Sequence, residues 1–441
     1  APPFVDRGGV RHGGCMDSEL PPHSCMPRST VLLCMGTRPE IIKMAPVYHA
    51  LRGGPLTPVV LHTGQHDSIA WPLYQFFGME PDRALDLTRE RPSLGHLNAQ
   101  LLDALDGVLD AENAEAVLVH GDTSSALSAA MAAFYAGAPV GHVEAGLRSG
   151  NPTDPFPEEM NRTVIARLAT WHFAPTHRAV RNLVREGVRP ESISLVGNTV
   201  VDAVHHGLGV IGSGSWVPSG LPADTAEWTR SGRLALVTMH RRENWGRPIE
   251  EVAAAIAEAV LATPDLRVLW PVHPNPAVGA AVQAGLDRAG LSASARARIR
   301  LVEPLDYPAM LWALRRSWLV LTDSGGIQEE AAALDRPVLV LRQTTERPEL
   351  IEAGGGVLVG ASGDAVRSWL RDLTTRPDAY AALRCETNPY GDGTAGEQIA
   401  ATLADEVAHR ATTGMPRIPA PSAPHVGPLP PAPVVLSVLA A

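Results

Sequence analysis

Short apolar runs alternate with longer amphipathic segments through the first half of the chain. The runs are rich in Val, Ile and Leu and have the length of strands, whereas the segments between them have the length and spacing of helices. In chain order the runs are TVLLCM (30–35), TPVVLH (57–62), AVLVH (116–120), PVGHVEA (139–145) and ISLVG (193–197). This alternation predicts parallel strands with crossover helices on both faces of a sheet.

The same pattern restarts after a Gly-, Ser- and Pro-rich stretch at residues 209–222, which we interpret as a linker. The second series of runs is RLALVTM (233–239), LRVLWPV (266–272), RIRLVE (298–303), SWLVLTD (317–323) and RPVLVLR (336–342). A chain of 441 residues is long enough for two full hydrophobic cores. The sequence therefore predicts an α/β protein with two Rossmann-like domains.

The predicted domain boundaries follow from these two series. The expected segments are a disordered leader (1–29), an N-terminal domain (30–205), a C-terminal domain (206–385), a helical segment packing back across the domains (386–411) and a Pro- and Ala-rich disordered tail (412–441).

Composition narrows the classes of partner and the compartment. Acidic residues outnumber basic ones by 47 to 37, and this excess disfavours nucleic acid and anionic membranes. We find neither a signal-peptide layout nor an apolar run long enough to span a bilayer. Four cysteines without metal-type or secreted spacing fit a reducing compartment. We expect a cytoplasmic protein with neither nucleic-acid nor membrane partners.

The first strand leads into a turn, Gly36 to Glu40, that brings the Arg38 cation to a helix start. In sheets of this kind ligands bind beyond the carboxyl ends of the strands, and such a corner suits a phosphate. A Pro-started helix with a solvated Arg explains the motif equally well. The turn is neither a GxGxxG fingerprint nor a Walker loop, which disfavours nicotinamide and ATP as ligands.

Three carboxylates follow strand ends in the first half of the chain. Asp122 and Glu144 come directly after apolar runs, and Glu158 shares a helix face with Arg162, four residues on. Singly, each is more often a helix cap or a surface ion pair. Crowded at one rim of a sheet, they would have pKa values pushed apart, which creates an acid and a base.

The second half supplies two histidines and a glycine turn. His240 and His273 follow strands, and neither has the spacing of a metal ligand, so we predict no metal site. Satisfied loop histidines are an equally good interpretation. The turn Ser324, Gly325, Gly326 starts a helix and would let backbone amides approach a diphosphate, with Glu330 placed to accept hydrogen bonds from ribose.

Taken together, these motifs resemble a known family. GTRPEIIKMAP, TGQH, HGDTSS, GHVEAGLRSG, PFPEEMNR, VGNTVVDA, HRREN, PVHPNP, LTDSGGIQEEAAAL, TTERPE and NPYGDG occur in this order between about residues 30 and 405. The chain resembles the non-hydrolysing bacterial UDP-N-acetylglucosamine (UDP-GlcNAc) 2-epimerases. The resemblance implies a glycosyltransferase-B-type arrangement with an interdomain active-site cleft, a homodimer and no cofactor.

The resemblance also implies roles for individual residues. The reaction would interconvert UDP-GlcNAc and UDP-N-acetylmannosamine (UDP-ManNAc) by eliminating UDP to a 2-acetamidoglucal and adding it back. Asp122, Glu144 and Glu158 would form the acid/base group at sugar carbon 2, in an order that the sequence leaves open. The other implied site residues are His240, Arg38, Lys43 and Arg162 for the departing diphosphate, and His273, Ser324, Gly325, Gly326 and Glu330 for UDP.

Departures from the family pattern keep alternatives open. Where members commonly read QHRQM at a second, allosteric UDP-GlcNAc site, this chain has residues 65–69 with Ser68, and Gln100 takes the place of a downstream Arg. We therefore expect reduced or absent allosteric activation. Hydrolysing 2-epimerases, which release N-acetylmannosamine and UDP, also lack this site and are the close alternative. Met239 and Trp245 are expected to reshape the sugar pocket.

Two further alternatives are more distant. A glycosyltransferase of the same fold would need an acceptor pocket and fewer rim carboxylates. A non-catalytic UDP-sugar sensor would need the phosphate-binding residues but not the carboxylates.

Overall fold

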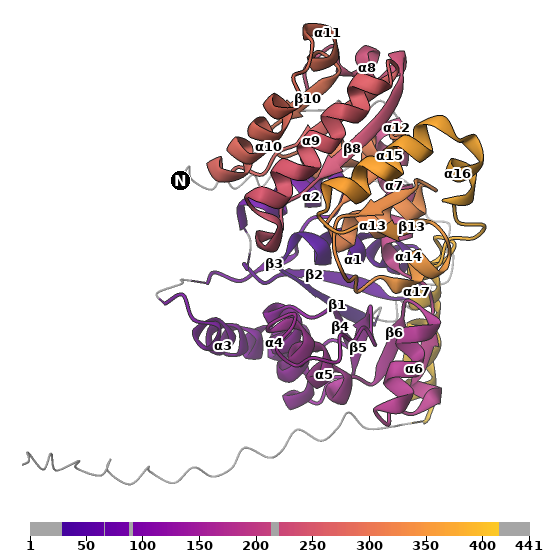
Figure 1. Ribbon diagram of the computed structural model, residues 1–441. Helices are drawn as coiled ribbons and strands as arrows, with labels where there is room; N and C mark the ends of the chain where they lie inside the picture. The colour runs from indigo at the N-terminus through magenta and orange to yellow at the C-terminus, as the bar shows by residue number, and fades with distance from the viewer. Residues whose placement is uncertain (1–28, 66, 88–90, 213–219, 414–441) are drawn as a thin grey trace, which may run out of the picture.

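A computed structural model describes residues 29–65, 67–87, 91–212 and 220–413. Within these ranges the chain forms two lobes, each built on one parallel sheet with helices on both faces (Figure 1). This confirms the predicted class of two Rossmann-like domains. The predicted leader and most of the predicted tail lie outside the described residues, although the last helix continues to Thr413.

The described part of the N-terminal lobe has a seven-stranded sheet in the order β3-β2-β1-β4-β5-β6-β7. Its strands are β1 (Thr30–Met35), β2 (Thr57–His62), β3 (Arg83–Ala84), β4 (Ala116–His120), β5 (Val140–Val143), β6 (Trp171–Ala174) and β7 (Ile193–Leu195). Strand β6 was not predicted because WHFA is four residues long and has none of the Val, Ile and Leu residues that mark the predicted runs. Strand β3 is only two residues long and has no apolar pattern.

The C-terminal lobe has six strands among its described residues, in the order β10-β9-β8-β11-β12-β13. They are β8 (Arg233–Thr238), β9 (Leu266–Pro271), β10 (Ile299–Val302), β11 (Leu319–Thr322), β12 (Val338–Val340) and β13 (Gly356–Leu358). Strand β13 was missed because three residues inside a Gly-rich stretch give no period-two signal.

Helices connect the strands in both lobes. Those of the N-terminal half are α1 (Arg38–Arg52), α2 (Asp67–Phe76), α3 (Leu94–Glu112), α4 (Ser124–Tyr135), α5 (Glu158–Leu168), α6 (His177–Arg185) and α7 (Thr199–Gly212), with the 3-10 turn η1 (Pro190–Ser192). The C-terminal half contributes α8 (Thr225–Trp228), α9 (Arg247–Ala262), α10 (Pro276–Arg288), α11 (Ala293–Arg296), α12 (Tyr307–Arg316), α13 (Gly325–Ala333), α14 (Pro348–Glu352), α15 (Gly363–Thr375), α16 (Pro377–Ala382) and α17 (Ala395–Thr413), with η2 (Thr229–Ser231) and η3 (Arg242–Asn244).

Both faces of each sheet are buried, which explains why the strands are continuous apolar runs. In β1, Val31 and Leu33 pack toward α1, α2 and α17, whereas Leu32 and Cys34 pack toward α3 and α4. In the second lobe the side chains of β8 divide in the same way, between α9, α10 and α15 on one face and α12 and α13 on the other.

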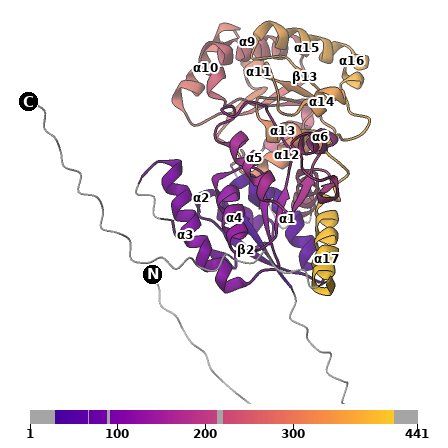
Figure 2. The same ribbon diagram turned by 90° about the horizontal axis from the view of Figure 1, so that it is seen from below.

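Two helices tie the lobes together. Helix α7 is continuous through Gly212 and packs against α1 as well as α12 and α13, so the boundary placed at residue 205 falls inside one helix. The first four residues of the stretch interpreted as a linker are also helical. Helix α17 returns to the N-terminal lobe and packs against α1 (Figure 2), and Gly396 there donates its amide to Asp202 Oδ1 at 2.8 Å.

The loop that follows β5 depends on a glycine. Gly146 has a φ of +90°, and a Cβ built on it would lie 2.4 Å from the backbone oxygen of Ala179 in α6. The change Gly146→Ala is expected to lower the free energy of unfolding by about 2 to 4 kcal/mol, because it adds backbone strain to a clash with main chain. Urea denaturation followed by circular dichroism measures this loss.

Gly107 supplies the matched control. It is an exposed residue of α3, and a Cβ built on it meets nothing within 4 Å. Gly107→Ala is expected to raise the free energy of unfolding by about 0.5 to 1 kcal/mol, since Ala is the better helix former. Equal stability of the two variants would contradict the role assigned to Gly146.

Candidate active site

A cavity of about 790 Å³ lies between the lobes, at the carboxyl ends of strands from both sheets. Eleven of the twelve residues predicted for the site line it: Arg38, Lys43, Asp122, Glu144, Glu158, Arg162, His240, His273, Ser324, Gly326 and Glu330. Gly325 does not line the cavity, but it lies beside Arg347, which does. A Cβ built on Gly325 would lie 3.6 Å from the guanidinium carbon of Arg347.

Glu144 follows β5 and is held in place from several sides. Its backbone has a φ of +64°, unusual for a residue with a side chain and often found at functional sites. The Glu144 carboxylate pairs with Lys43 and accepts a hydrogen bond of 3.0 Å from Asn198 Nδ2. Burial alone would raise the pKa of Glu144, but the positive charge of Lys43 holds it well below its ordinary value. This carboxylate is therefore held in its ionised form.

Asp122 follows β4, and its pKa is shifted in the opposite direction to that of Glu144. Its side chain pairs with Arg162 Nη2 at 2.5 Å, and its backbone oxygen accepts from Asn161 Nδ2 at 2.8 Å. Burial raises the pKa of Asp122, and the nearby charges of Glu144 and Glu158 add to the effect while Arg162 opposes it. Neighbouring carboxyl groups with opposite shifts are suited to act as an acid and a base.

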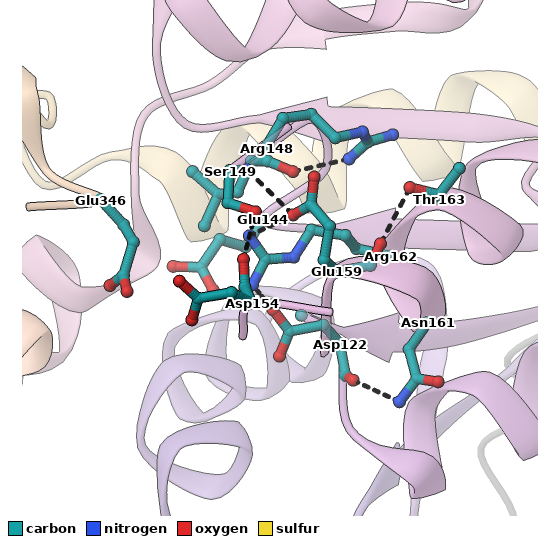
Figure 3. Close-up of polar contacts among 12 residues, drawn as sticks. Asp122, Glu144, Arg148, Ser149, Asp154, Glu159, Asn161, Arg162, Thr163 and Glu346 are labelled. Carbon is teal, nitrogen blue, oxygen red and sulfur yellow. Dashed lines mark hydrogen bonds and ion pairs between the residues drawn. The ribbon is translucent and has the colours of Figure 1, made fainter. Parts of the chain in front are cut away.

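The helix α5 delivers the remaining groups of this cluster. Glu158 is its first residue and lines the cavity, and Arg162 lies one turn further on. Glu159 is 3.4 Å from Arg162 and accepts the amides of Ser149 and Gly150, both at 2.9 Å. Figure 3 shows Asp122, Glu144 and Glu159 grouped around the Arg162 guanidinium. Glu159 thus links Arg162 to the loop that contains Ser149 and Gly150.

The turn before α1 corrects one expectation about phosphate binding. Glu40 is buried and accepts the backbone amides of Gly36 at 2.8 Å and Thr37 at 2.7 Å. These amides are therefore occupied and do not serve a phosphate. Among the described residues no carboxylate pairs with Arg38, which is half-buried and lines the cavity, so its side chain is the cation that this corner offers.

The C-terminal lobe contributes a histidine fixed by a buried carboxylate. His240 follows β8, and its Nδ1 lies 3.0 Å from Asp323 Oδ1, which also accepts the His240 amide. Burial would raise the pKa of Asp323, but its hydrogen bonds, led by that from His240, hold it below its ordinary value. His240 itself is half-exposed toward the cavity. The pair orients the imidazole, whose Nε2 makes no hydrogen bond to any described residue.

The start of α13 has the features expected for a diphosphate and a ribose. Ser324 and Gly326 line the cavity where the helix begins. Glu330 is buried, and its Oε2 has no hydrogen-bond partner in the described part of the chain. Burial raises the pKa of Glu330 to about 7, against the opposing charge of Arg38. An unpartnered buried carboxylate at a cavity wall is a candidate ligand-binding group.

Four residues that complete the site were not predicted: Asn198, Asp323, Glu329 and Arg347. Each lies within a motif that the sequence displays, but its partner is distant in the chain. Arg347 pairs with Glu329 at 2.6 Å, and Asn198 reaches Glu144 across 54 residues. The only available signal was position, because Asp323 and Asn198 each follow a strand as the predicted residues do.

The expected departures from the family pattern are only partly visible. Gln65 lines the cavity and accepts a hydrogen bond of 2.7 Å from Ser125, whereas residue 66 and the side chain of Ser68 lie outside the described residues. Gln100 belongs to α3. Met239 is buried at the cavity wall, and Trp245 donates its indole nitrogen to the backbone oxygen of His240 at 3.1 Å. Allosteric activation stays a prediction.

None of the helices in the described ranges combines the length and apolar character needed to cross a membrane. Nor do His, Cys, Asp and Glu side chains gather there in groups of three or more that could hold a metal ion.

Comparison with known proteins gives a consistent result. The family model described as UDP-N-acetylglucosamine 2-epimerase matches residues 49–404. The UDP-N-acetylglucosamine 2-epimerases of Escherichia coli K12 and Bacillus subtilis 168 are 40% and 38% identical, over 85% and 86% of this chain and 98% and 96% of theirs.

A solved structure agrees with these relatives. The crystal structure of UDP-GlcNAc 2-epimerase from Neisseria meningitidis bound to UDP-GlcNAc superposes with a TM-score of 0.74 at 35% identity, covering 85% of this chain and all of that one. Both the resemblance and the glycosyltransferase-B-type fold are thereby confirmed. The chain belongs to the UDP-N-acetylglucosamine 2-epimerase family.

Proposed function

We propose that this protein interconverts UDP-GlcNAc and UDP-ManNAc by inverting carbon 2 of the sugar, without net hydrolysis. One observation carries the proposal: Asp122 and Glu144 have pKa values shifted in opposite directions and face the same interdomain cavity. The start of α13 and Glu330 line the other side of this cavity, where a nucleoside diphosphate would bind. The named activities of the relatives support the same reaction.

The chemistry explains why such a pair is needed. The C2–H bond of the sugar adjoins no carbonyl, so a carboxylate base alone cannot remove its proton. Breaking the C1–O bond to UDP makes C1 cationic in character and C2–H acidic. The C1–O bonding pair leaves with UDP, a carboxylate takes the C2 proton, and the C2–H bonding pair forms the C1=C2 double bond of 2-acetamidoglucal. A proton returned to C2 on the opposite face and readdition of UDP at C1 complete the inversion.

The described contacts suggest how the other residues divide this work. Lys43 is occupied by two carboxylates, Glu144 and Glu329, so we assign the departing diphosphate first to Arg38 and His240. Arg162 pairs with Asp122 and is assigned to orienting that acid. Glu158 is placed near enough to Asp122 to complete the acid/base group.

Phosphorus NMR of the wild-type reaction tests the proposal against the hydrolysing alternative. With UDP-GlcNAc as the only substrate, two UDP-sugars at equilibrium are expected, with little free UDP. Stoichiometric accumulation of UDP with N-acetylmannosamine would identify a hydrolysing enzyme. No change in the UDP-sugar would contradict both reactions and favour a sensor.

A pH dependence follows from Glu330. Its pKa of about 7 means that the anion, which accepts hydrogen bonds from ribose hydroxyls, dominates above pH 7 and is lost as the pH falls below it. UDP binding is therefore expected to weaken below pH 7 more in the wild type than in Glu330→Gln, whose amide does not titrate. Isothermal titration calorimetry with UDP, carried out on both proteins at several pH values, measures the difference. Protonation of UDP itself affects both proteins equally and therefore cancels in the comparison. Parallel profiles would contradict the assignment.

We further propose a cytoplasmic homodimer. Phe134 and Tyr135 at the end of α4 are 40% and 58% exposed, and adjacent exposed aromatic side chains suit a subunit interface. Cys34 and Cys385 are free thiols, as is usual in a reducing compartment. Light scattering of the purified protein tests the dimer, and a monomeric mass would contradict it.

A further inference from the structure

A chain of four alternating charges crosses the cleft between the lobes. Glu144 pairs with Lys43, Lys43 Nζ lies 2.9 Å from Glu329 Oε2, and Glu329 Oε1 lies 2.6 Å from Arg347 Nε. Glu144 and Lys43 belong to the N-terminal lobe, and Glu329 and Arg347 to the C-terminal lobe. All four side chains are at most 15% exposed. The chain therefore connects the assigned base to the opposite lobe through buried ion pairs.

Glu329 differs from the other three members because it does not line the cavity. Its side chain is only 1% exposed, and its two ion-pair partners, Lys43 and Arg347, both line the cavity. A buried carboxylate is costly unless cations compensate it, and here two do so. Glu329 can influence a bound sugar only through them.

The charge balance indicates what this arrangement achieves. Lys43 is shared between Glu144 and Glu329, and Arg347 pairs with Glu329 and also lies 3.6 Å from Glu346. Without the charge of Glu329, Lys43 would have Glu144 as its one ion-pair partner among the described residues, and Arg347, whose charge also acts on Glu144, would keep only Glu346. They would then neutralise Glu144 more strongly and make it a weaker base, because proton removal follows the basicity of the acceptor.

We propose that Glu329 is a positioning residue for the epimerisation. Its carboxylate partly compensates the positive charges of Lys43 and Arg347 and holds both side chains beside Glu144. Glu144 therefore stays fixed in place and basic enough to remove the C2 proton. The inference rests on the proposed function. It assigns to Glu329 an effect on turnover rather than on the binding of UDP.

The test compares Glu329→Gln with Glu349→Gln. Glu349 also joins the lobes, since it accepts a hydrogen bond of 2.9 Å from Thr176 Oγ1, but it does not line the cavity or contact Lys43. For each variant we would measure C2 deuterium exchange in heavy water, the Kd of UDP and the melting temperature. Glu329→Gln is expected to exchange C2 about tenfold or more slowly. Its UDP affinity should be unchanged or tighter, because the crevice has lost one negative charge, and Glu349→Gln should exchange as the wild type does.

Two results would overturn the inference. One is wild-type exchange in Glu329→Gln. The other is a parallel loss of exchange and UDP affinity, shared by Glu349→Gln, which would indicate that Glu329 merely docks the lobes. A wild type that exchanges no deuterium contradicts the proposed function instead.

If Glu329→Gln does not fold, Glu329→Asp decides the question. The Asp variant keeps the charge but shortens its reach to Lys43. Slower exchange with retained UDP affinity supports the inference, and loss of both contradicts it.

Discussion

Replacing Glu144 with Gln is expected to lower epimerisation by at least about a hundredfold while UDP binding stays nearly intact. Glu144 is the carboxylate whose pKa the charge of Lys43 holds low against burial, so it is ionised and able to accept the C2 proton. A Gln amide cannot accept this proton, although it fills the same space and can still bond to Asn198. Steady-state kinetics and isothermal titration with UDP measure the two quantities.

Glu186 provides the control for this change. It makes two hydrogen bonds of 2.7 Å to Arg148 in the same lobe but does not line the cavity. Glu186→Gln removes the same charge from a partly buried ion pair, and its turnover is expected to match the wild type. Near-wild-type turnover in Glu144→Gln would remove Glu144 from the catalytic set. A similar loss in both variants would indicate a general effect of charge on the lobe.

The second large effect is expected for Arg38→Ala, which should weaken UDP binding by about tenfold to a hundredfold. Arg38 is the first residue of α1, lines the cavity and pairs with no carboxylate in the described part of the chain. Its guanidinium is therefore free to meet the diphosphate, and a charge-assisted hydrogen bond to phosphate is among the stronger polar contacts. Isothermal titration with UDP measures the loss.

Arg52 tests whether this effect depends on position. It is the last residue of the same helix, is exposed and does not line the cavity, and its side chain donates a hydrogen bond of 3.5 Å to Tyr48 Oη. Arg52→Ala removes the same charge but should leave the Kd of UDP unchanged. If Arg38→Ala and Arg52→Ala bind UDP equally well, Arg38 does not contact the diphosphate.

Much of the fold could be predicted from apolar periodicity alone. The ten predicted runs all contain strands, because a parallel sheet buried on both faces forces each strand to be continuously apolar. The three missed strands lie where this rule weakens: β3 and β13 are two and three residues long, and the four residues of β6 include no Val, Ile or Leu. The predicted linker begins too early in the sequence, because Gly209 and Gly212 belong to α7 despite their low helix propensity.

In the candidate site, the residues that reach the cavity could be predicted, but their ion pairs could not. Position after a strand was enough to bring Asp122, Glu144 and His240 to one cavity, because parallel strands all end at the same rim. Which charges pair was not predictable. Lys43 was expected at the diphosphate, yet it lies between Glu144 and Glu329, and its second partner comes from the opposite lobe. Such pairings depend on how two sheets meet, which no local pattern encodes.

We expect a carboxylate of the N-terminal lobe to remove the C2 proton while the C-terminal lobe retains UDP. Incubating the wild-type enzyme with UDP-GlcNAc in heavy water, followed by proton NMR of the recovered UDP-sugars, tests it most directly. Deuterium is expected at C2 of both UDP-GlcNAc and UDP-ManNAc, because the abstracted proton exchanges with solvent before UDP adds back. Formation of UDP-ManNAc that keeps its original C2 hydrogen would rule out removal of the C2 proton.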